Sequence, residues 1–265
     1  MKKLHIYVNT GKPDAAAKGA LIASRLAAFD LVESDVAKAE AILALGGDGT
    51  ILKAVREFRD TPVLGLNLGG LGYLSSVGYR EADRALKMLS EGRFTISKRT
   101  LVEARMGETR ALALNDVVIT RDATAHSIRL DLAADGKLVT RYMADGLIFA
   151  TPTGSTAYSL AAGGPVVLAD SPSLVVTPLT PHSLSVRPLV VRDDVHFTVT
   201  ARARTDGNKV ALGVYADGQK VQTLDIGESI SISKARECAQ LVELEGYDPY
   251  DVLARKLGWS GSNVK

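Results

Sequence analysis

Hydrophobic and polar residues alternate in two different ways along the chain, and the first pattern occupies residues 1–98. Apolar runs at 4–8, 41–45 and 62–67 are too short for buried helices and are typical of strands. The stretches 15–28 and 81–90, and the residues that follow Gly49, place apolar side chains at helical spacing instead. Strands that alternate with helices predict a parallel, doubly wound, Rossmann-like α/β domain.

From residue 99 onward, short β-favouring runs follow one another, and Asp-Gly turn signals separate several of them. Apart from a short stretch at 157–162, helical spacing returns only in the amphipathic segment 249–257, which we expect to fold back onto the first domain. We therefore predict an α/β domain made of 1–98 plus about 240–265, and a mostly antiparallel, sandwich-like β domain made of 99–239. The expected strands of the second domain lie at 101–106, 110–120, 127–133, 137–142, 146–150, 174–177, 195–203, 210–216, 220–224 and 229–234.

Composition narrows the class of protein. The formal net charge of +2 argues against a protein that coats a polyanion, so no nucleic-acid partner is expected. Cys238 is the only cysteine, which excludes a disulfide within the chain and fits a reducing compartment. The first apolar run is too short for a signal peptide, and no stretch approaches the length of a membrane span. We therefore expect a cytoplasmic protein with no membrane partner.

The first chemistry-bearing stretch is Gly-Gly-Asp-Gly-Thr at 46–50. It follows the expected strand 41–45 and precedes a helix, an order that makes a helix N-terminus available to an anion. Glycines without a Cβ let a phosphate or a sugar approach the backbone closely. Asp48 is the unusual member, because a carboxylate holds phosphate poorly but accepts a proton, binds a hydroxyl or holds a metal. The simpler explanation is a tight turn whose Asp caps the following helix.

The second stretch runs from Asp145 through the expected strand 146–150 into a loop rich in hydroxyl groups, Thr-Pro-Thr-Gly-Ser-Thr at 151–156, and then Gly163-Gly164. Hydroxyls and loop amides donate to phosphate oxygens without adding fixed charge. Tyr158 offers a flat face for a base and a hydroxyl for hydrogen bonding. A turn that caps a helix at Ala157 is the simpler explanation, but it requires fewer special residues than this stretch contains.

Three further positions are candidates with weaker signals. Asn115-Asp116 interrupts an apolar strand, where an amide and a carboxylate can recognise a base edge and a ribose hydroxyl; a bulge or a strand-end turn is the alternative. His126 is the weakest candidate, because a lone histidine is more often a surface or structural residue. The stretch Asp217-Gly218-Gln219 is typical of a hairpin turn. The chain lacks a P-loop, a protein-kinase His-Arg-Asp set and zinc-ligand spacing, and no Gly-x-Gly-x-x-Gly follows its first strand.

Taken together, these residues resemble the NAD kinase family over nearly the whole chain. The stretch 46–50 alone is shared with diacylglycerol and sphingosine lipid kinases, whereas the stretch 151–159, followed by Gly163-Gly164-Pro165, is similar to the NAD kinase signature itself. The resemblance also includes the stretch 65–74, Asn115-Asp116 and the stretch 181–188. It implies transfer of a phosphoryl group from ATP or polyphosphate to NAD, with Mg²⁺ on the donor phosphates and no metal held by protein ligands alone.

The resemblance also implies roles for individual residues. Asp48 matches the proton acceptor for the 2′-hydroxyl of the adenosine ribose. Many relatives carry a basic residue where this chain has Met143, with Arg141 as the nearest cation, and serine is common where Ala161 stands. The implied nucleotide contacts are Gly49, Asn115, Asp116, His126, Asp145, Thr156, Ala157, Tyr158, Ser159, Leu160, Ala161 and Gln219.

Relatives are usually homodimers or homotetramers, and the resemblance implies the same here. Two rival functions stay open at this point. A lipid kinase shares the first loop and predicts an exposed apolar or basic entrance, but it does not explain the second signature. A non-catalytic dinucleotide sensor retains the pocket and loses the catalytic carboxylate, whereas Asp48 is present.

Overall fold

The computed structural model describes residues 1–8, 13–33, 35–69, 72–74, 77–121, 128–203 and 211–259. The chain forms two compact units, one made of 1–98 and 239–265 and the other of 99–238. The unit boundaries fall within two long strands, β6 (Phe94–Met106) and β17 (Ser229–Leu244).

The first unit is built on a parallel sheet with strand order β2-β1-β3-β4. β5 and the last part of β17 also pair with β4, both in parallel. The register aligns the carboxyl ends of the central strands, since Val8 pairs with Leu45 and Gly46 pairs with Asn67. The strands are β1 (Lys3–Val8), β2 (Asp30–Leu31), β3 (Ala41–Gly46), β4 (Val63–Asn67) and β5 (Val77–Gly78).

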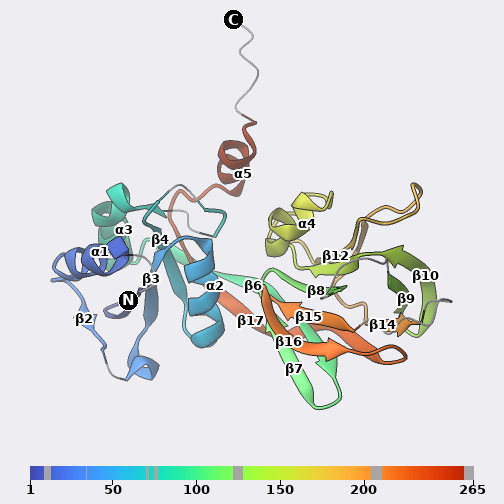
Figure 1. Ribbon diagram of the computed structural model, residues 1–265. Helices are drawn as coiled ribbons and strands as arrows, with labels where there is room; N and C mark the ends of the chain where they lie inside the picture. Colours follow the sequence, from blue (N-terminus) through green and yellow to red (C-terminus); the bar gives the residue numbers. More distant parts are fainter. Residues whose placement is uncertain are drawn as a thin grey trace, which may run out of the picture. The chain divides into compact units, whose positions relative to one another are not determined.

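Helices cover both faces of this sheet. Leu43 and Leu45 of β3 belong to the same buried cluster as the apolar residues of α1 and α3. On the opposite face, His5 and Tyr7 of β1 contact the ring of Phe58, at the end of α2, with ring centroids 5.5 Å apart. Figure 1 accordingly shows α1 and α3 on one side of β3 and α2 on the other. The helices are α1 (Pro13–Ala23), α2 (Asp48–Glu57), α3 (Ala82–Ser90) and α5 (Pro249–Leu257), with short 3₁₀ helices η1 (Val36–Lys38) and η2 (Tyr79–Glu81).

The second unit is a β-sandwich. One sheet has the antiparallel order β10-β9-β14-β17, with β6 and β7 attached, and the other has the order β13-β12-β11-β8-β15-β16. Both sheets contribute side chains to one core, in which Phe149 and Phe197 lie with ring centroids 5.4 Å apart. The remaining elements are β7 (Thr109–Ala113), β8 (Asp116–Arg121), β9 (Ile128–Ala134), β10 (Lys137–Ala144), β11 (Gly146–Ala150), η3 (Thr153–Thr156), α4 (Tyr158–Ala161), β12 (Ser173–Leu179), β13 (Leu189–Arg192), β14 (Phe197–Arg202), β15 (Leu212–Ala216) and β16 (Gln219–Leu224).

The predicted fold class is confirmed, with a doubly wound α/β sheet followed by an antiparallel β-rich sandwich. Several local predictions were wrong, including the strand expected at 229–234, which continues to Leu244. The expected strand 110–120 is two strands, so Asn115 precedes β8 instead of lying inside a strand. The first helix ends at Ala23 instead of residue 28, and the strand β13 was not expected. Among the described residues, no helix has the length and apolar content needed to cross a membrane.

Candidate active site

The carboxyl end of β3 meets the start of α2 at the Gly-Gly-Asp-Gly-Thr loop. Gly47 is the N-cap residue in extended conformation, and Asp48 is the first residue of the helix. Gly46 is required by packing, because a Cβ at this position would lie 2.1 Å from the Thr50 Oγ1 atom. The sharp turn therefore directs the first amides of α2, which have no partner within a helix, out of the end of the sheet.

Packing against the described residues does not explain why positions 47 and 49 are glycine. A Cβ built on either residue meets no atom of the described chain within 4 Å. The φ angle of Gly47 is −97°, which any residue adopts. Among the described residues, neither the backbone conformation of Gly47 nor the packing around either position requires glycine, and these residues leave space beside the Asp48 carboxylate.

The Asp48 carboxylate is held by backbone donors from the segment after β4. Its Oδ2 atom accepts a hydrogen bond from the Tyr73 amide at 2.8 Å, and its Oδ1 atom accepts one from the Leu74 amide at 3.1 Å. The Tyr73 pKa is raised by partial burial and, second, by the charge of Asp48. On the far side, the Lys256 Nζ atom of α5 lies 5.3 Å from the Tyr73 ring centroid. The two backbone amides help to fix the orientation of the Asp48 carboxylate.

In the β-rich unit, the loop after β11 packs directly on the start of β8. The Thr151 amide donates to the Asn115 carbonyl at 2.9 Å, and the Thr151 hydroxyl donates to the Leu114 carbonyl at 2.5 Å. A Cβ on Gly154 would lie 1.9 Å from the Asn115 carbonyl oxygen, so only glycine fits where the two backbones touch. The loop at 151–156 and Asn115-Asp116 therefore form one continuous structure.

The Asp217 carboxylate holds the backbone of residues 114–116 in place. Asp217 occupies the hairpin turn between β15 and β16 with φ of 46°, as the Asp-Gly signal predicted. Its carboxylate accepts hydrogen bonds from the amides of Leu114 at 2.9 Å, Asn115 at 2.8 Å and Asp116 at 3.3 Å. Sequence analysis identified the turn but missed this role, because nothing local to Asp217 shows which distant amides its side chain reaches.

Asp116 is a buried acid whose pKa is strongly raised. It begins β8 with 5% of its surface exposed. Burial, and second the charge of Asp217, raise the pKa of the Asp116 carboxyl from 3.8 to about 7. A buried acid that titrates near neutral pH is characteristic of functional sites.

Two buried hydroxyls in the stretch 151–159 stabilise the signature loop. The Ser155 hydroxyl is fully buried, donates to the Pro152 carbonyl at 2.7 Å and accepts from the Val167 amide at 3.0 Å. The Ser159 hydroxyl, also fully buried, shares a 2.8 Å hydrogen bond with the Thr177 hydroxyl. Both hydroxyls therefore stabilise the fold, and the nucleotide contact of Ser159 stays a prediction.

The other predicted residues of the signature are more accessible. Thr156 ends η3, with its hydroxyl donating to the Thr153 carbonyl at 3.2 Å, and Ala157 links η3 to α4. Tyr158 begins α4 with 49% of its surface exposed, and Ala161 is exposed at the end of that helix. Leu160, between them, is half-buried.

The remaining predicted residues are Asp145, Gln219 and His126. Asp145 precedes β11 and pairs with Arg121 at 3.1 Å, and it accepts a hydrogen bond from the Thr180 hydroxyl. Six residue steps separate Asp145 from the start of the signature loop at Thr151, a distance of about 20 Å along a strand. Gln219 is exposed at the first position of β16, and His126 lies outside the described residues.

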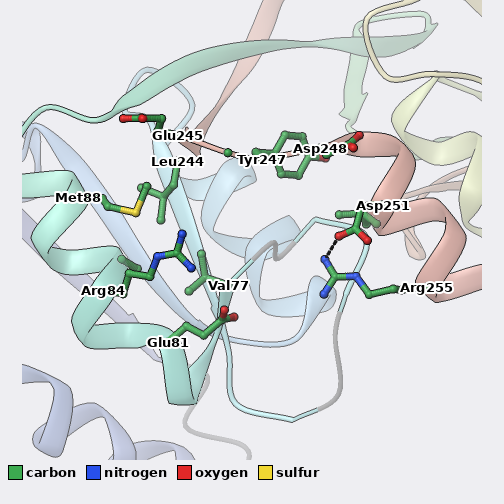
Figure 2. Close-up of a pocket in the computed structure, with 13 residues that line it drawn as sticks. Val77, Glu81, Arg84, Met88, Leu244, Glu245, Tyr247, Asp248, Asp251 and Arg255 are labelled. Carbon is green, nitrogen blue, oxygen red and sulfur yellow. Dashed lines mark hydrogen bonds and ion pairs between the residues drawn. The ribbon is translucent and has the colours of Figure 1, made fainter.

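A separate cavity of about 160 Å³ lies in the α/β unit between α3 and the segment that leads into α5. Figure 2 shows Met88 and Val77 beside Arg84, with Asp251 and Arg255 forming an ion pair across from them. None of the predicted site residues lines this cavity.

Comparison with known proteins gives concordant matches across the chain. The model of the ATP-NAD kinase N-terminal domain matches residues 26–94, and that of the ATP-NAD kinase C-terminal domain matches residues 114–244. The NAD kinase of Syntrophotalea carbinolica is 37% identical over an alignment of 286 positions, which covers 98% of this chain and 99% of that protein. The NAD kinase of Gemmatimonas aurantiaca is 40% identical over 230 residues, covering 84% of this chain and 78% of its own length.

Solved structures agree with the sequence matches. A yeast NADH kinase in complex with NADH superimposes with a TM-score of 0.86 at 27% identity, covering 99% of this chain and 89% of that one. An NAD kinase from Archaeoglobus fulgidus in complex with ATP superimposes with a TM-score of 0.79 at 26% identity, covering 98% of this chain and all of that one (100%).

Proposed function

Because the chain belongs to the NAD kinase family, we propose that it transfers the terminal phosphoryl group of ATP to the 2′-hydroxyl of the adenosine ribose of NAD, forming NADP and ADP. The observation that carries the proposal is the placement of Asp48. Its carboxylate is oriented by two backbone amides and stands between two glycines whose surroundings are open. A hydroxyl-bearing substrate therefore has room to approach an acceptor whose position is fixed.

In the proposed step, the ribose oxygen forms a bond to the γ-phosphorus while the bond to the β–γ bridging oxygen breaks. The Asp48 carboxylate accepts the hydroxyl proton as the new bond forms. Such transfers proceed through a loose transition state, so alignment and electrostatic stabilisation supply most of the catalysis. The N-terminus of α2 would stabilise negative charge on the phosphoryl oxygens.

We propose that a magnesium ion arrives with ATP and is not held by protein ligands alone. Within the part of the chain that the structure describes, no three His, Cys, Asp or Glu side chains are grouped to hold a metal. Mg²⁺ commonly keeps several waters and binds substrate phosphates with one or two carboxylates, so a resident protein cage is not needed. When bound to the donor phosphates, Mg²⁺ would neutralise part of their charge.

The β-rich unit supplies the proposed recognition of the dinucleotide. The side chains of Asn115 and Asp116 stand on the backbone segment that Asp217 and the signature loop hold in place. An amide and a carboxyl in this position suit a base edge and a ribose hydroxyl. The exposed Tyr158 offers its ring to a base. Asp145 lies at the other end of β11, so we expect it to contact a different group from the one that Asn115 contacts.

The test is the Asp48→Asn variant, which keeps the shape of the side chain and removes most of its basicity. We expect turnover to fall by about 10²–10⁴-fold while NAD binding, measured by calorimetry, stays within about threefold of wild type. Asp83→Asn is the matched control, because Asp83 is an exposed acid of α3 whose one ion pair among the described residues is with Arg25. Near-wild-type turnover of Asp48→Asn would refute the assignment of the proton acceptor.

A coupled assay of NADP formation tests the reaction itself. ATP or polyphosphate is offered as donor, and NAD or NADH as acceptor, in all four pairs. The absence of a phosphorylated dinucleotide in every pair would refute the proposed function. Homodimer or homotetramer formation and a cytoplasmic location stay predictions, and light scattering of the purified chain tests the first.

A further inference from the structure

The backbone of the short segment that leads into β8 is fully hydrogen-bonded, and Asp217 supplies most of its partners. The Asp217 carboxylate accepts hydrogen bonds from three consecutive amides, those of Leu114 at 2.9 Å, Asn115 at 2.8 Å and Asp116 at 3.3 Å. The Asp217 amide donates to the Asp116 carbonyl at 3.0 Å. The hydroxyl and the amide of Thr151 satisfy the two other carbonyls. Two residues therefore fix the three amides and the three carbonyls of this segment.

The side chains of Asn115 and Asp116 make no hydrogen bond or ion pair with any residue that the structure describes. The Asn115 side chain is half-buried, and Asp116 has only 5% of its surface exposed. Buried polar groups in folded proteins are normally paired. A segment whose backbone is saturated, and whose side chains still lack partners, is suited to present those side chains to a ligand.

The hairpin turn does not explain an acid at position 217. Asp217 has a φ of 46° and precedes Gly218 at 75°, and asparagine adopts this conformation as readily. An acid is also unfavourable here, because Asp217 stands opposite Asp116 where the ladder of β8 and β15 ends, and facing like charges destabilise a sheet. The carboxylate differs from an amide in its second acceptor oxygen: Oδ1 binds the amides of residues 115 and 116, and Oδ2 binds that of residue 114. The segment that it holds therefore explains the acid.

We propose that Asp217 is a positioning residue for the dinucleotide, which holds the backbone so that Asn115 and Asp116 present an amide and a carboxyl to NAD. The inference rests on the proposed function and adds to it a residue that acts through its neighbours. The segments outside the described residues, 122–127 and 204–210, connect to β8 and β15 at their opposite ends, where Arg121 pairs with Leu212.

The experiment compares Asp217→Asn and Asp217→Ala with wild type in the full-length chain. Asparagine keeps the turn conformation and one acceptor oxygen, whereas alanine removes every side-chain hydrogen bond. The KM of NAD, the KM of ATP and kcat come from the coupled assay, and the Kd of NAD comes from calorimetry. We expect the KM and the Kd of NAD to rise by about threefold or more in Asp217→Asn and by about tenfold or more in Asp217→Ala. The KM of ATP and kcat should change little, because the segment is proposed to contact NAD alone.

Asp135 provides a matched control, because it occupies an equivalent Asp-Gly hairpin turn. Its φ is 48°, and Gly136 follows at 77°. Its carboxylate accepts a hydrogen bond from the His196 amide at 3.0 Å, so it holds a different part of the chain. Asp135→Asn and Asp135→Ala make the same changes in a similar turn and should leave the KM and the Kd of NAD unchanged.

Unchanged NAD affinity in both Asp217 variants would overturn the proposal. An equal rise in the KM of NAD and of ATP, or an equal effect of the Asp135 variants, would also overturn it, because the role of Asp217 would then be in folding alone. If Asp217→Ala does not fold, Asp217→Asn decides the question, since asparagine satisfies the turn. A wild-type chain that binds NAD and forms no NADP would refute the proposed reaction, while the calorimetric comparison would still decide the role of Asp217.

Discussion

The buried carboxyl of Asp116 predicts an unusual dependence of stability on pH, and the Asp116→Asn variant isolates it. In the folded chain the pKa of Asp116 is about 7, whereas its ordinary value is 3.8. Folding therefore favours the protonated form. The stability contributed by that form is fully present below pH 3.8 and is lost as the pH rises through about 7.

The size of the effect follows from the shift. A shift of about three pKa units corresponds to about 4 kcal/mol of unfolding free energy between the two pH limits. Only 5% of the Asp116 surface is exposed, so solvent screening reduces this value little. At pH 5 about 1.5 kcal/mol has already been lost, which leaves about 2.5 kcal/mol to be lost between pH 5 and pH 8. Asparagine has nearly the same shape and no charge, so the Asp116→Asn variant should lose none of this amount.

The assay is urea unfolding of wild type and Asp116→Asn at intervals from pH 5 to pH 8. The difference in unfolding free energy should move by about 2.5 kcal/mol in favour of the variant as the pH rises. Asp217→Asn is the control for the second cause, because removing the neighbouring charge should bring the midpoint of the wild-type change below 7. A difference that is constant across the pH range would refute the assignment of a raised pKa.

Three further substitutions separate the structural and ligand-facing parts of the two signatures. Gly154→Ala should lower the unfolding free energy by about 1–3 kcal/mol in a denaturant titration, because the new Cβ meets the Asn115 backbone. Gly47→Ala should leave stability within about 1 kcal/mol of wild type and raise the KM of the nucleotide, since its Cβ enters open space; an unchanged KM would contradict a ligand there. Ser159→Ala should lower the unfolding free energy by about 1–3 kcal/mol, because the buried Thr177 hydroxyl loses its partner, and kcat should change little. A loss below about 0.5 kcal/mol would contradict that role.

Periodicity predicted the architecture because each buried strand is a run of consecutive or alternating apolar residues. It failed at Leu114 and Asn115 for a physical reason. Leu114 is apolar and buried, so the stretch 110–120 has the composition of one strand. The break between β7 and β8 depends on Asp217, whose carboxylate binds amides more than 100 positions earlier in the chain. A contact of this range leaves no periodic signal near either partner.

The candidate site was predictable in its position and not in its contacts. The order of strand, glycine turn and helix placed Asp48 at the end of β3, because this local geometry follows from local sequence. Nothing in the stretch 46–50 indicates that the Tyr73 and Leu74 amides hold the carboxylate. The hydroxyls at 151–159 suggested ligand donors, whereas burial assigns Ser155 and Ser159 to the fold. Residue type alone does not tell which way a hydroxyl points.

The glycines of the two signatures separate into two kinds that the sequence does not distinguish. Gly46 and Gly154 are fixed by the chain itself, since a Cβ at either position would collide with neighbouring atoms. Gly47 and Gly49 have open surroundings, so the described fold would accept alanine at both. A glycine that folding does not require, beside an oriented carboxylate and a helix N-terminus, is explained by a ligand whose approach a Cβ would block. Among the described residues, the surroundings of Gly47 and Gly49 therefore leave room for the proposed substrate beside Asp48.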